Sequence, residues 1–313
     1  MGEDLTVPVP LEGGRSGVTL AARLGDREVV IKAAPEGRPA RGRHDVLRQA
    51  DVLDALAGVE GVATPRVLAR VSGVDTAFVM ERAAGSAVEP VLDADTVTLP
   101  ADLVRARAGR AARMLAALHA VDLAAHPATR DAAVADVGDE LERWSATAMA
   151  ADPAVARGID VLYDRLRASV PAGSGEPVLV HGDYRLGNIV FDGTEPTGLI
   201  DWEIWGVTGA AVDLGWFLVF CDADAFPGIG GAVDGLPSAA ELLGVYQDAG
   251  GTAPPDVDWF DAFGRFKMAA IMAHNLRRHR EGRHHDPYQE RLPPTIARLI
   301  ETGLERVGQR VAS

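Results

Sequence analysis

Cysteine is almost absent from this chain of 313 residues, which carries a single one, Cys221. A disulfide framework and a thiolate metal site each need several cysteines, so the sequence excludes both and fits a reducing compartment. No apolar run approaches the roughly 18 residues that a membrane-spanning helix requires. The N-terminus is acidic and has neither the basic nor the apolar region of a signal peptide. We therefore expect a cytoplasmic protein with no membrane partner.

Lysine is scarce as well, and acidic residues outnumber basic ones. The chain has two lysines, Lys32 and Lys267, and a formal net charge of −14. Nucleic-acid phosphates need clustered Lys and Arg, so this balance argues against a nucleic-acid partner. The negative charge would help to attract a cationic small-molecule substrate. A solvated acidic surface that keeps the protein soluble explains the charge more simply, and both interpretations stay open.

Several catalytic motifs are missing. No Gly-x-Ser-x-Gly segment is present, which argues against a Ser–His–Asp hydrolase. A two-metal phosphatase needs additional His and Asp ligands, and the sequence contains neither Asp-x-His nor His-x-His. His284 and His285 are adjacent, and no Cys or carboxylate cluster completes a tetrahedral zinc set with them. Both hydrolase classes and a zinc site are therefore set aside.

What the chain does contain is a stretch with two acids and an amide at fixed spacing. Asp183 and Asn188 stand five residues apart, the spacing of a phosphoryl-transfer loop, and Asp201 follows an apolar run. Mg²⁺ prefers oxygen ligands, typically one or two carboxylates besides phosphate and water. The spacing predicts Asn188 and Asp201 as magnesium ligands, with Asp183 free to orient an acceptor and take its proton. His181 is expected to support the loop, and Arg185 either contacts phosphate or substrate or lies on the surface.

An alternating, β-branched pattern predicts a hairpin near the N-terminus, with strands over 18–24 and 27–33. The glycine-rich segment 13–17 precedes it and would let the backbone approach phosphates, although a plain turn explains it equally well. Lys32 ends an apolar strand, where a kinase lysine reaches the α and β phosphates. An edge-strand lysine that blocks aggregation is the alternative. The strand position and the upstream glycines together favour the phosphate role.

The first part of the chain is predicted to be mainly sheet. Residues 1–10 are interpreted as an irregular lead-in, 41–58 as a helix, and 66–71 and 76–81 as a second pair of strands. These strands and the helix form one unit that ends near residue 85. We expect residues 1–85 to form a nucleotide-binding lobe.

The rest of the chain, residues 86–313, is predicted to be mainly helical, which makes the fold class α+β. Residues 86–100 and 206–209 are expected to be loops, and a helix is expected to begin at residue 210. Apolar spacing predicts the other helices over 101–121, 136–150, 154–169, 238–249, 256–282 and 287–310. We expect this larger lobe to carry catalysis and substrate binding.

Over roughly residues 11–280 the sequence resembles the aminoglycoside phosphotransferase family, also called the kinase-like phosphotransferases. The segments that carry the resemblance are Thr64–Leu68, Leu115–Asp122, Leu179–Asn188, Leu199–Glu203 and Val212–Gly215. The resemblance implies a protein-kinase-like bilobal fold, ATP or GTP as donor, and Mg²⁺ as cofactor. It also implies transfer of the γ-phosphate to a hydroxyl of a small molecule, such as an aminoglycoside, another antibiotic or a metabolite alcohol.

The resemblance also implies roles for single residues. Asp183 would be the catalytic base, Asn188 and Asp201 the magnesium ligands, and the backbone from Met80 to Ala83 would meet the nucleotide base. The residues expected to contact the nucleotide are Gly14, Ser16, Lys32, Gln49, Met80, Glu81 and Ala83.

One position departs from the family pattern. Where a glutamate usually pairs with the lysine, this chain has Gln49, which can hydrogen-bond Lys32 but cannot form an ion pair with it. Asp45 or Asp51 would be the substitutes, or Lys32 is held loosely and turnover is slow. The alternative function is therefore a nucleotide-binding, pseudokinase-like protein without transferase activity. The Ile-Asp-Trp-Glu segment resembles the broad subgroup that also occurs joined to acyl-CoA dehydrogenases, so drug resistance does not follow.

Overall fold

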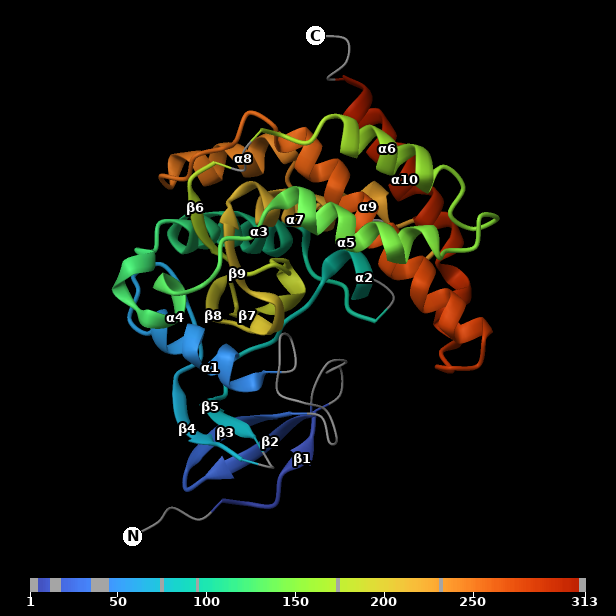
Figure 1. Ribbon diagram of the computed structural model, residues 1–313. Helices are drawn as coiled ribbons and strands as arrows, with labels where there is room; N and C mark the ends of the chain where they lie inside the picture. Colours follow the sequence, from blue (N-terminus) through green and yellow to red (C-terminus); the bar gives the residue numbers. More distant parts are fainter. Residues whose placement is uncertain are drawn as a thin grey trace.

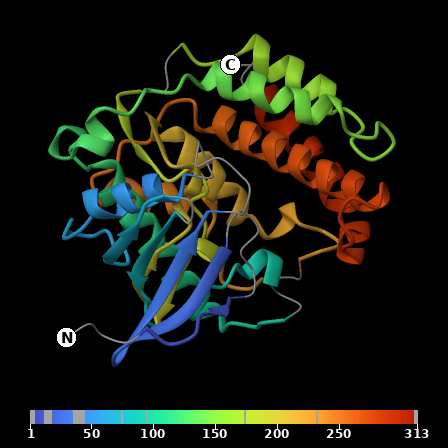
Figure 2. The same cartoon turned by 60° about the horizontal axis from the view of Figure 1, so that its bottom comes forward.

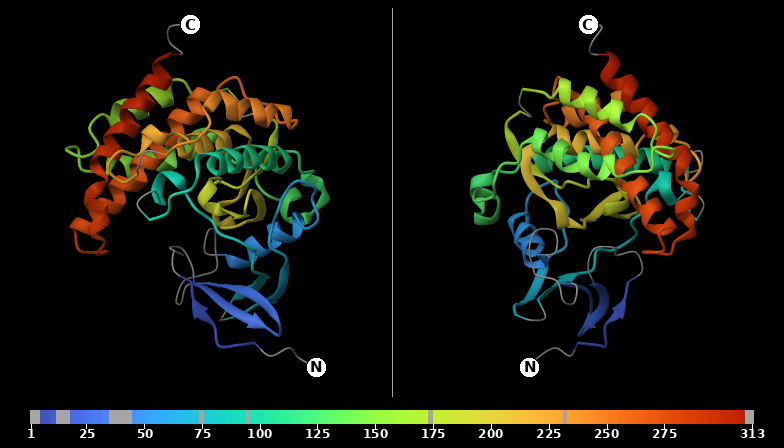
Figure 3. Two further views of the ribbon diagram at one scale, coloured as in Figure 1. Left: turned by 180° about the vertical axis from the view of Figure 1, so that it is seen from behind. Right: turned by 45° about the vertical axis from the view of Figure 1, so that its right-hand side comes forward.

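The computed structural model shows a small sheet-containing lobe below a larger helical lobe (Figure 1). The same separation is visible from behind and from the side (Figure 3). The described residues are 5–11, 18–34, 45–73, 76–93, 96–172, 175–230 and 233–309. Within them, no helix combines the length and the apolar character needed to cross a membrane.

The small lobe contains an antiparallel sheet of five strands in the order β1-β2-β3-β5-β4. Its strands are β1 (Val9–Pro10), β2 (Val18–Leu24), β3 (Arg27–Ala33), β4 (Val67–Val71) and β5 (Ala77–Glu81). The predicted hairpin is β2–β3, closed by a two-residue turn in which Gly25 has φ of 59°. Only glycine adopts such a φ without a steric cost. The interpretation of residues 1–10 as irregular is wrong for β1, which pairs with β2 at the edge where proline is tolerated.

A single helix, α1 (Val46–Ala55), completes this lobe and lies between the sheet and the larger lobe (Figure 2). It begins where the Asp45 side chain accepts a hydrogen bond from the backbone N–H of Arg48. Such a cap satisfies one of the free donors at a helix start. Apolar spacing predicts one face of Val46, Ala50, Leu53 and Ala57; the first three are buried, whereas Ala57 lies beyond the helix and is exposed. Burial of this face holds α1 against both lobes.

The larger lobe is helical, as predicted, apart from two short two-stranded sheets. Its helices are α2 (Pro90–Asp93), α3 (Ala101–His119), α4 (Pro127–Arg130), α5 (Val137–Met149), α6 (Ile159–Ala168), α7 (Ala211–Phe220), α8 (Ala239–Asp248), α9 (Val257–Arg280) and α10 (Pro293–Gln309). The expectation of an unbroken loop over 86–100 is wrong, because α2 forms one helical turn there.

The two strand pairs lie around and within the stretch with the two acids and the amide. β6 (Pro177–Val180) pairs with β9 (Gly206–Gly209), and β7 (Ile189–Asp192) pairs with β8 (Glu195–Leu199). The prediction of a loop over 206–209 is therefore wrong. This segment extends because Val207 is buried and pairs with Leu179, which is buried as well. The pairing brings the end of β8 beside the loop that follows β6.

One of the two hydrophobic cores spans both lobes. It joins Phe78 and Met80 of the sheet, Leu53 of α1, and Tyr184 and Trp205 from the stretch between β6 and β9. Full burial of one large apolar side chain contributes about 1.5–3 kcal/mol. The other core lies between α5, α6, α7, α9 and α10. The first core is the one that fixes the candidate site, since residues on both sides of the site belong to it.

Candidate active site

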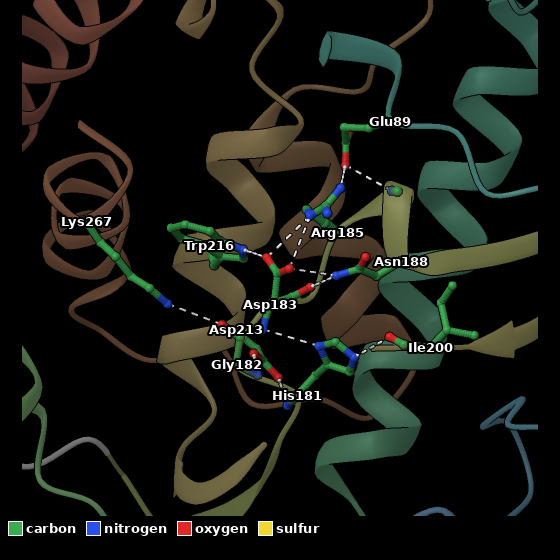
Figure 4. A network of polar contacts seen from close by, with 11 residues as sticks. Glu89, His181, Gly182, Asp183, Arg185, Asn188, Ile200, Asp213, Trp216 and Lys267 are labelled. Carbon is green, nitrogen blue, oxygen red and sulfur yellow. Dashed lines mark hydrogen bonds and ion pairs between the residues drawn. The ribbon is translucent and has the colours of Figure 1, made fainter. Parts of the chain in front are cut away.

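The Asp183 carboxylate lies in the loop between β6 and β7 and is held from three sides (Figure 4). Trp216 Nε1 on α7 donates to Asp183 Oδ1 at 2.6 Å, and Asn188 Nδ2 donates to Oδ2 at 2.8 Å. Arg185 Nε lies 3.3 Å from Oδ1. The side chain nevertheless stays 23% exposed. The carboxylate is therefore fixed in orientation and still accessible to a reacting group.

A buried acid on α7, Asp213, fixes the backbone just before Asp183. Its two oxygens accept hydrogen bonds from the N–H groups of His181 at 2.6 Å and Gly182 at 2.8 Å. His119 Nε2 lies 3.6 Å from Asp213, at the edge of hydrogen-bonding distance. Burial opposes ionisation, but the interactions with His119 and His181 outweigh it and lower the pKa of Asp213. The family-like segment Val212–Gly215 contains Asp213, but no role was predicted for this residue from the sequence.

The ring of His181 supports the loop, the role predicted for it. Its Nδ1 accepts the N–H of Asp183 at 3.2 Å, and its Nε2 lies 2.9 Å from the carbonyl oxygen of Ile200. With Nδ1 as acceptor, the proton belongs on Nε2, and the ring then donates to Ile200. His181 is completely buried. It therefore ties the Asp183 loop to the residue before Asp201.

Glu89 and Arg185 form a buried pair behind Asp183 that the sequence did not reveal. Glu89 Oε2 accepts the N–H of Gly187 at 3.0 Å and lies 3.5 Å from Arg185 Nη1. Burial raises the pKa of Glu89 to about 7, against the opposing charge of Arg185. Glu89 precedes α2 in the stretch expected to be a loop, so neither spacing nor a motif marked it. Arg185, for which a surface role was one option, is instead largely buried.

The second lysine of the chain, Lys267, also reaches this loop. From α9 it points toward Gly182, and its Nζ donates to the Gly182 carbonyl at 3.3 Å (Figure 4). The ammonium lies 4.3 Å from the centre of the Trp216 ring and 5.6 Å from that of Trp144, within cation–π range. Burial lowers the pKa of Lys267. Trp144 thus packs against the core and also lies next to a charged group.

Asn188 and Asp201 are brought together by the hydrogen bond from Ile200 N to the Asn188 carbonyl, 2.9 Å long. Asn188 uses its amide nitrogen for both hydrogen bonds to Asp183, which leaves its amide oxygen for a cation. Asp201 has φ of 68°, rare for a residue with a side chain. One carboxylate and one amide oxygen fit the oxygen donors that Mg²⁺ prefers. They are too few to form a closed protein cage, and the described residues contain no cluster of three or more His, Cys, Asp or Glu.

Lys32 faces this pair from the other lobe. Its Nζ lies 2.8 Å from Asp201 Oδ1. Burial opposes ionisation of Asp201, but the charge of Lys32 outweighs it and lowers the pKa of that carboxyl. Neither acid considered as a partner for Lys32 contacts it, because Asp45 caps α1 and Asp51 lies 3.4 Å from Arg70. The ionic partner of Lys32 is the predicted metal ligand itself.

Gln49 and Lys32 line the same small pocket between the lobes. Its walls are formed by Lys32, Gln49, Leu53, Pro65, Phe78, Met80, Leu199, Ile200, Asp201 and Trp202. Gln49 is buried. The pocket therefore combines apolar side chains with the Lys32–Asp201 pair.

Two N–H groups of the segment expected to meet the nucleotide base are already hydrogen-bonded to other residues of the small lobe. Glu81 N donates to Arg66 at 2.9 Å, and Arg82 N donates to Glu28 at 3.1 Å. The N–H of Ala83 takes part in none of the hydrogen bonds found among the described residues. Gly14 and Ser16, the predicted phosphate contacts, lie outside the described residues.

The small sheet lobe and the larger helical lobe make up the protein-kinase-like fold, with Lys32 of one lobe facing Asp201 of the other. The model of the Phosphotransferase enzyme family (APH) matches residues 8–270. The chain belongs to this family. The resemblance seen in the sequence and the expected bilobal fold are both confirmed.

Curated relatives are longer proteins. The chain is 27% identical to mouse acyl-CoA dehydrogenase family member 10, with 87% of this chain and 27% of the relative aligned. For rat acyl-CoA dehydrogenase family member 11 the identity is 27%, with 93% of this chain and 39% of the relative aligned. The chain thus spans well under half the length of these relatives. The predicted likeness to the subgroup joined to acyl-CoA dehydrogenases is confirmed.

Solved structures share the fold. A candidate aminoglycoside phosphotransferase from Ralstonia eutropha JMP134 gives a TM-score of 0.80 at 23% identity, covering 99% of this chain and 94% of that one. Macrolide 2'-phosphotransferase MphH from Brachybacterium faecium gives 0.60 at 22% identity, covering 95% and 94%. Aminoglycoside phosphotransferase APH(4)-Ia, solved with AMP-PNP and hygromycin B, gives 0.62 at 14% identity, covering 96% and 95%.

Proposed function

We propose that the protein transfers the γ-phosphate of ATP to a hydroxyl group of a small molecule. The observation that carries this proposal is the convergence of Asp183, Asn188 and Asp201 at one end of the β7–β8 hairpin, with Lys32 facing Asp201 from the other lobe. Phosphoryl transfer asks a protein mainly for positioning and charge compensation. These four side chains supply both.

Each residue would have a distinct task. Asp183 would orient the acceptor hydroxyl and take its proton, since its carboxylate is fixed and partly exposed. Asn188 and Asp201 would hold Mg²⁺, which when bound compensates the charge of the phosphates. Lys32 would move from Asp201 to the phosphates. Of the predicted contacts to the base, the Ala83 N–H is the best candidate, because the Glu81 N–H already bonds within the sheet.

The nucleotide and the acceptor are proposed at different levels of detail. The nucleotides named for neighbouring structures are AMP-PNP and ADP, so we propose ATP rather than GTP. The acceptor is proposed as a small hydroxyl compound, in line with hygromycin B in one neighbour. The overall charge of −14 favours a cationic acceptor, whereas the cations Arg185 and Lys267 beside Asp183 favour a neutral or acidic one. We place more weight on the local charges, because they lie where the acceptor would bind.

The test measures ATP consumption and phosphorylated product with a panel of antibiotics and metabolite alcohols. Asp183→Asn and Asp201→Asn keep the shape of each side chain and should lower turnover by about 100-fold or more. The matched control is Asp192→Asn, an exposed acid on β7 that lies outside the site. Turnover at the wild-type rate in both site variants would refute the assignment.

The second candidate is a nucleotide-binding protein without transferase activity. The observation that favours it is Gln49, which replaces the usual acidic partner, while Lys32 is paired with Asp201 instead. Thermal unfolding with and without Mg·ATP detects binding, and a product search across the panel detects transfer. Stabilisation by Mg·ATP with no product from any acceptor would support this candidate, and a phosphorylated product would eliminate it.

A further inference from the structure

Gln49 cannot form the ion pair that would tie helix α1 to Lys32. The adjacent residue, Arg48, makes a direct connection to the larger lobe instead. Arg48 Nη2 donates to the Trp205 carbonyl at 2.6 Å, and Trp205 Nε1 donates back to the Arg48 carbonyl at 3.0 Å. The guanidinium also lies 3.9 Å from the centre of the Trp205 ring. Two hydrogen bonds in opposite directions and one stacked cation make this contact specific in orientation.

Burial gives this contact weight. Trp205 is 3% exposed, and burial lowers the pKa of Arg48 against the opposing effect of Asp45. Hydrogen bonds that are shielded from water are costly to break, because the partners left behind remain unsatisfied. A surface contact between two flexible side chains would carry no comparable information.

The position of Trp205 in the chain is the second observation. It follows the short 3-10 turn Trp202–Ile204, which comes directly after Asp201, and it precedes β9. The same turn packs on the Asp183 loop, since a side chain at Gly182 would lie 2.5 Å from the Ile204 carbonyl oxygen. Gly182 has φ of 83°, so the fold requires glycine there. A shift of Trp205 would therefore move both ends of the site.

A second arginine contact of α1 provides the comparison. Arg70 on β4 forms ion pairs with Asp51 and Asp54, at 3.4 and 2.6 Å. These contacts hold α1 to the sheet within its own lobe, and the three side chains are 33–52% exposed. Exposed ion pairs contribute little and carry no connection to the site. The chain thus offers two arginine anchors for one helix, of which Arg48 alone contacts the segment after Asp201.

We propose that Arg48, through Trp205, is a positioning residue for Asp201 and takes over the coupling of α1 to the active site that a lysine–glutamate pair would otherwise provide. The proposal rests on the proposed function for its consequence, because Asp201 is there a magnesium ligand. The physical coupling between α1 and residues 199–206 is a property of the protein without any ligand.

The experiment has one readout for the coupling and another for its consequence. Hydrogen–deuterium exchange of the nucleotide-free protein is measured for peptides covering 46–55 and 199–206. Affinity for ADP is measured with Mg²⁺ and with EDTA. The variants are Arg48→Met, Arg48→Lys as the conservative rescue, Trp205→Phe, which removes the indole N–H and shrinks the ring, and Arg70→Met as the matched control.

We expect Arg48→Met to speed exchange in 199–206 as well as in α1, and to reduce the gain in ADP affinity from Mg²⁺ by about fivefold. ADP affinity in EDTA should stay at the wild-type value. Arg48→Lys should restore part of the protection, and Arg70→Met should affect α1 alone. If Arg48→Met does not fold, the milder Arg48→Lys and Trp205→Phe decide.

Unchanged exchange in 199–206 in the Arg48 variants, or an equal effect of Arg70→Met there, would overturn the coupling. Absence of magnesium-dependent ADP binding in the wild-type protein would instead contradict the proposed function. The exchange measurement decides the coupling in either case.

Discussion

At the scale of single residues, Glu89 is a buried acid whose carboxylate is only partly hydrogen-bonded. It is 2% exposed and contacts Arg185 and the N–H of Gly187, and its second oxygen, Oε1, has no hydrogen-bond partner. Its own N–H donates to Asp93. A buried carboxylate with one unpaired oxygen is costly in its charged form. Glu89 therefore stabilises the arrangement of Arg185 at the expense of overall stability above neutral pH.

The predicted consequence is a pH-dependent gain of stability in Glu89→Gln. The pKa of Glu89 rises from its ordinary 4.5 to about 7 in the folded protein. The folded state then binds the proton more tightly, so this group costs nothing below pH 4.5 and destabilises increasingly as pH rises through 7. The amide removes that cost, and Glu89→Gln should gain up to roughly 3 kcal/mol relative to wild type between pH 5 and 8. Urea unfolding at several pH values measures this difference. The exposed pair of Glu195 with Arg110 is the control, because Glu195→Gln removes a solvated ion pair and should change stability by less than about 1 kcal/mol.

At the scale of elements, α7 connects the core to the reacting groups. Its first turn carries Asp213 and its second carries Trp216, and both bond to the loop that contains Asp183. The helix lies against α9, which supplies Lys267. Precise placement of the loop thus depends on two packed helices rather than on the loop itself.

Asp213→Asn should destabilise the protein because its carboxylate accepts two backbone N–H groups while buried. An amide turns one acceptor into a donor facing a donor, at a cost of about 3 kcal/mol. The pKa of Asp213 is lowered in the folded state. Its stabilising contribution is present above its unfolded pKa and is lost as pH falls, so the variant should differ least from wild type in acid. Thermal unfolding followed by circular dichroism checks this. Asp160→Asn, at an exposed acid near the start of α6, is the control and should change the midpoint only slightly.

The sequence predicted the parts of the site that local patterns define. Asp183, Asn188 and Asp201 stay close in the fold because the β7–β8 hairpin returns the chain from Asn188 to Asp201. The partners of Lys32 and Asp183 could not be predicted in this way. Trp216 and Lys267 are 33 and 84 residues beyond Asp183 in the chain, and their contacts depend on helix packing. Long-range contacts of this kind leave no periodic signal in a single sequence.

At the scale of the whole molecule, the two lobes meet at the Lys32–Asp201 ion pair, at the Arg48–Trp205 contact and in the shared core. The bilobal α+β architecture followed from the change from alternating to helical periodicity, and the boundary near residue 85 stays a prediction. The ion pair joins Lys32 of the sheet lobe to Asp201 of the helical lobe. Both groups are proposed to bind parts of the same Mg·ATP. In the nucleotide-free protein, Lys32 and Asp201 are therefore paired with each other instead of with the nucleotide and the metal ion.

This competition predicts that Lys32→Met binds Mg²⁺ more tightly than wild type when no nucleotide is present. Without Lys32, Asp201 has no ionic partner to lose, and a partly exposed pair of this kind is worth up to about 1 kcal/mol, or roughly fivefold in affinity. The same variant should bind ATP more weakly, because the phosphates lose their cation. Calorimetric titration of Mg²⁺ and of ATP measures the two effects separately. Arg66→Met removes an exposed ion pair with Glu81 in the same lobe and should change neither affinity. Equal magnesium affinity in Lys32→Met and wild type would mean that Lys32 does not compete with Mg²⁺ for Asp201.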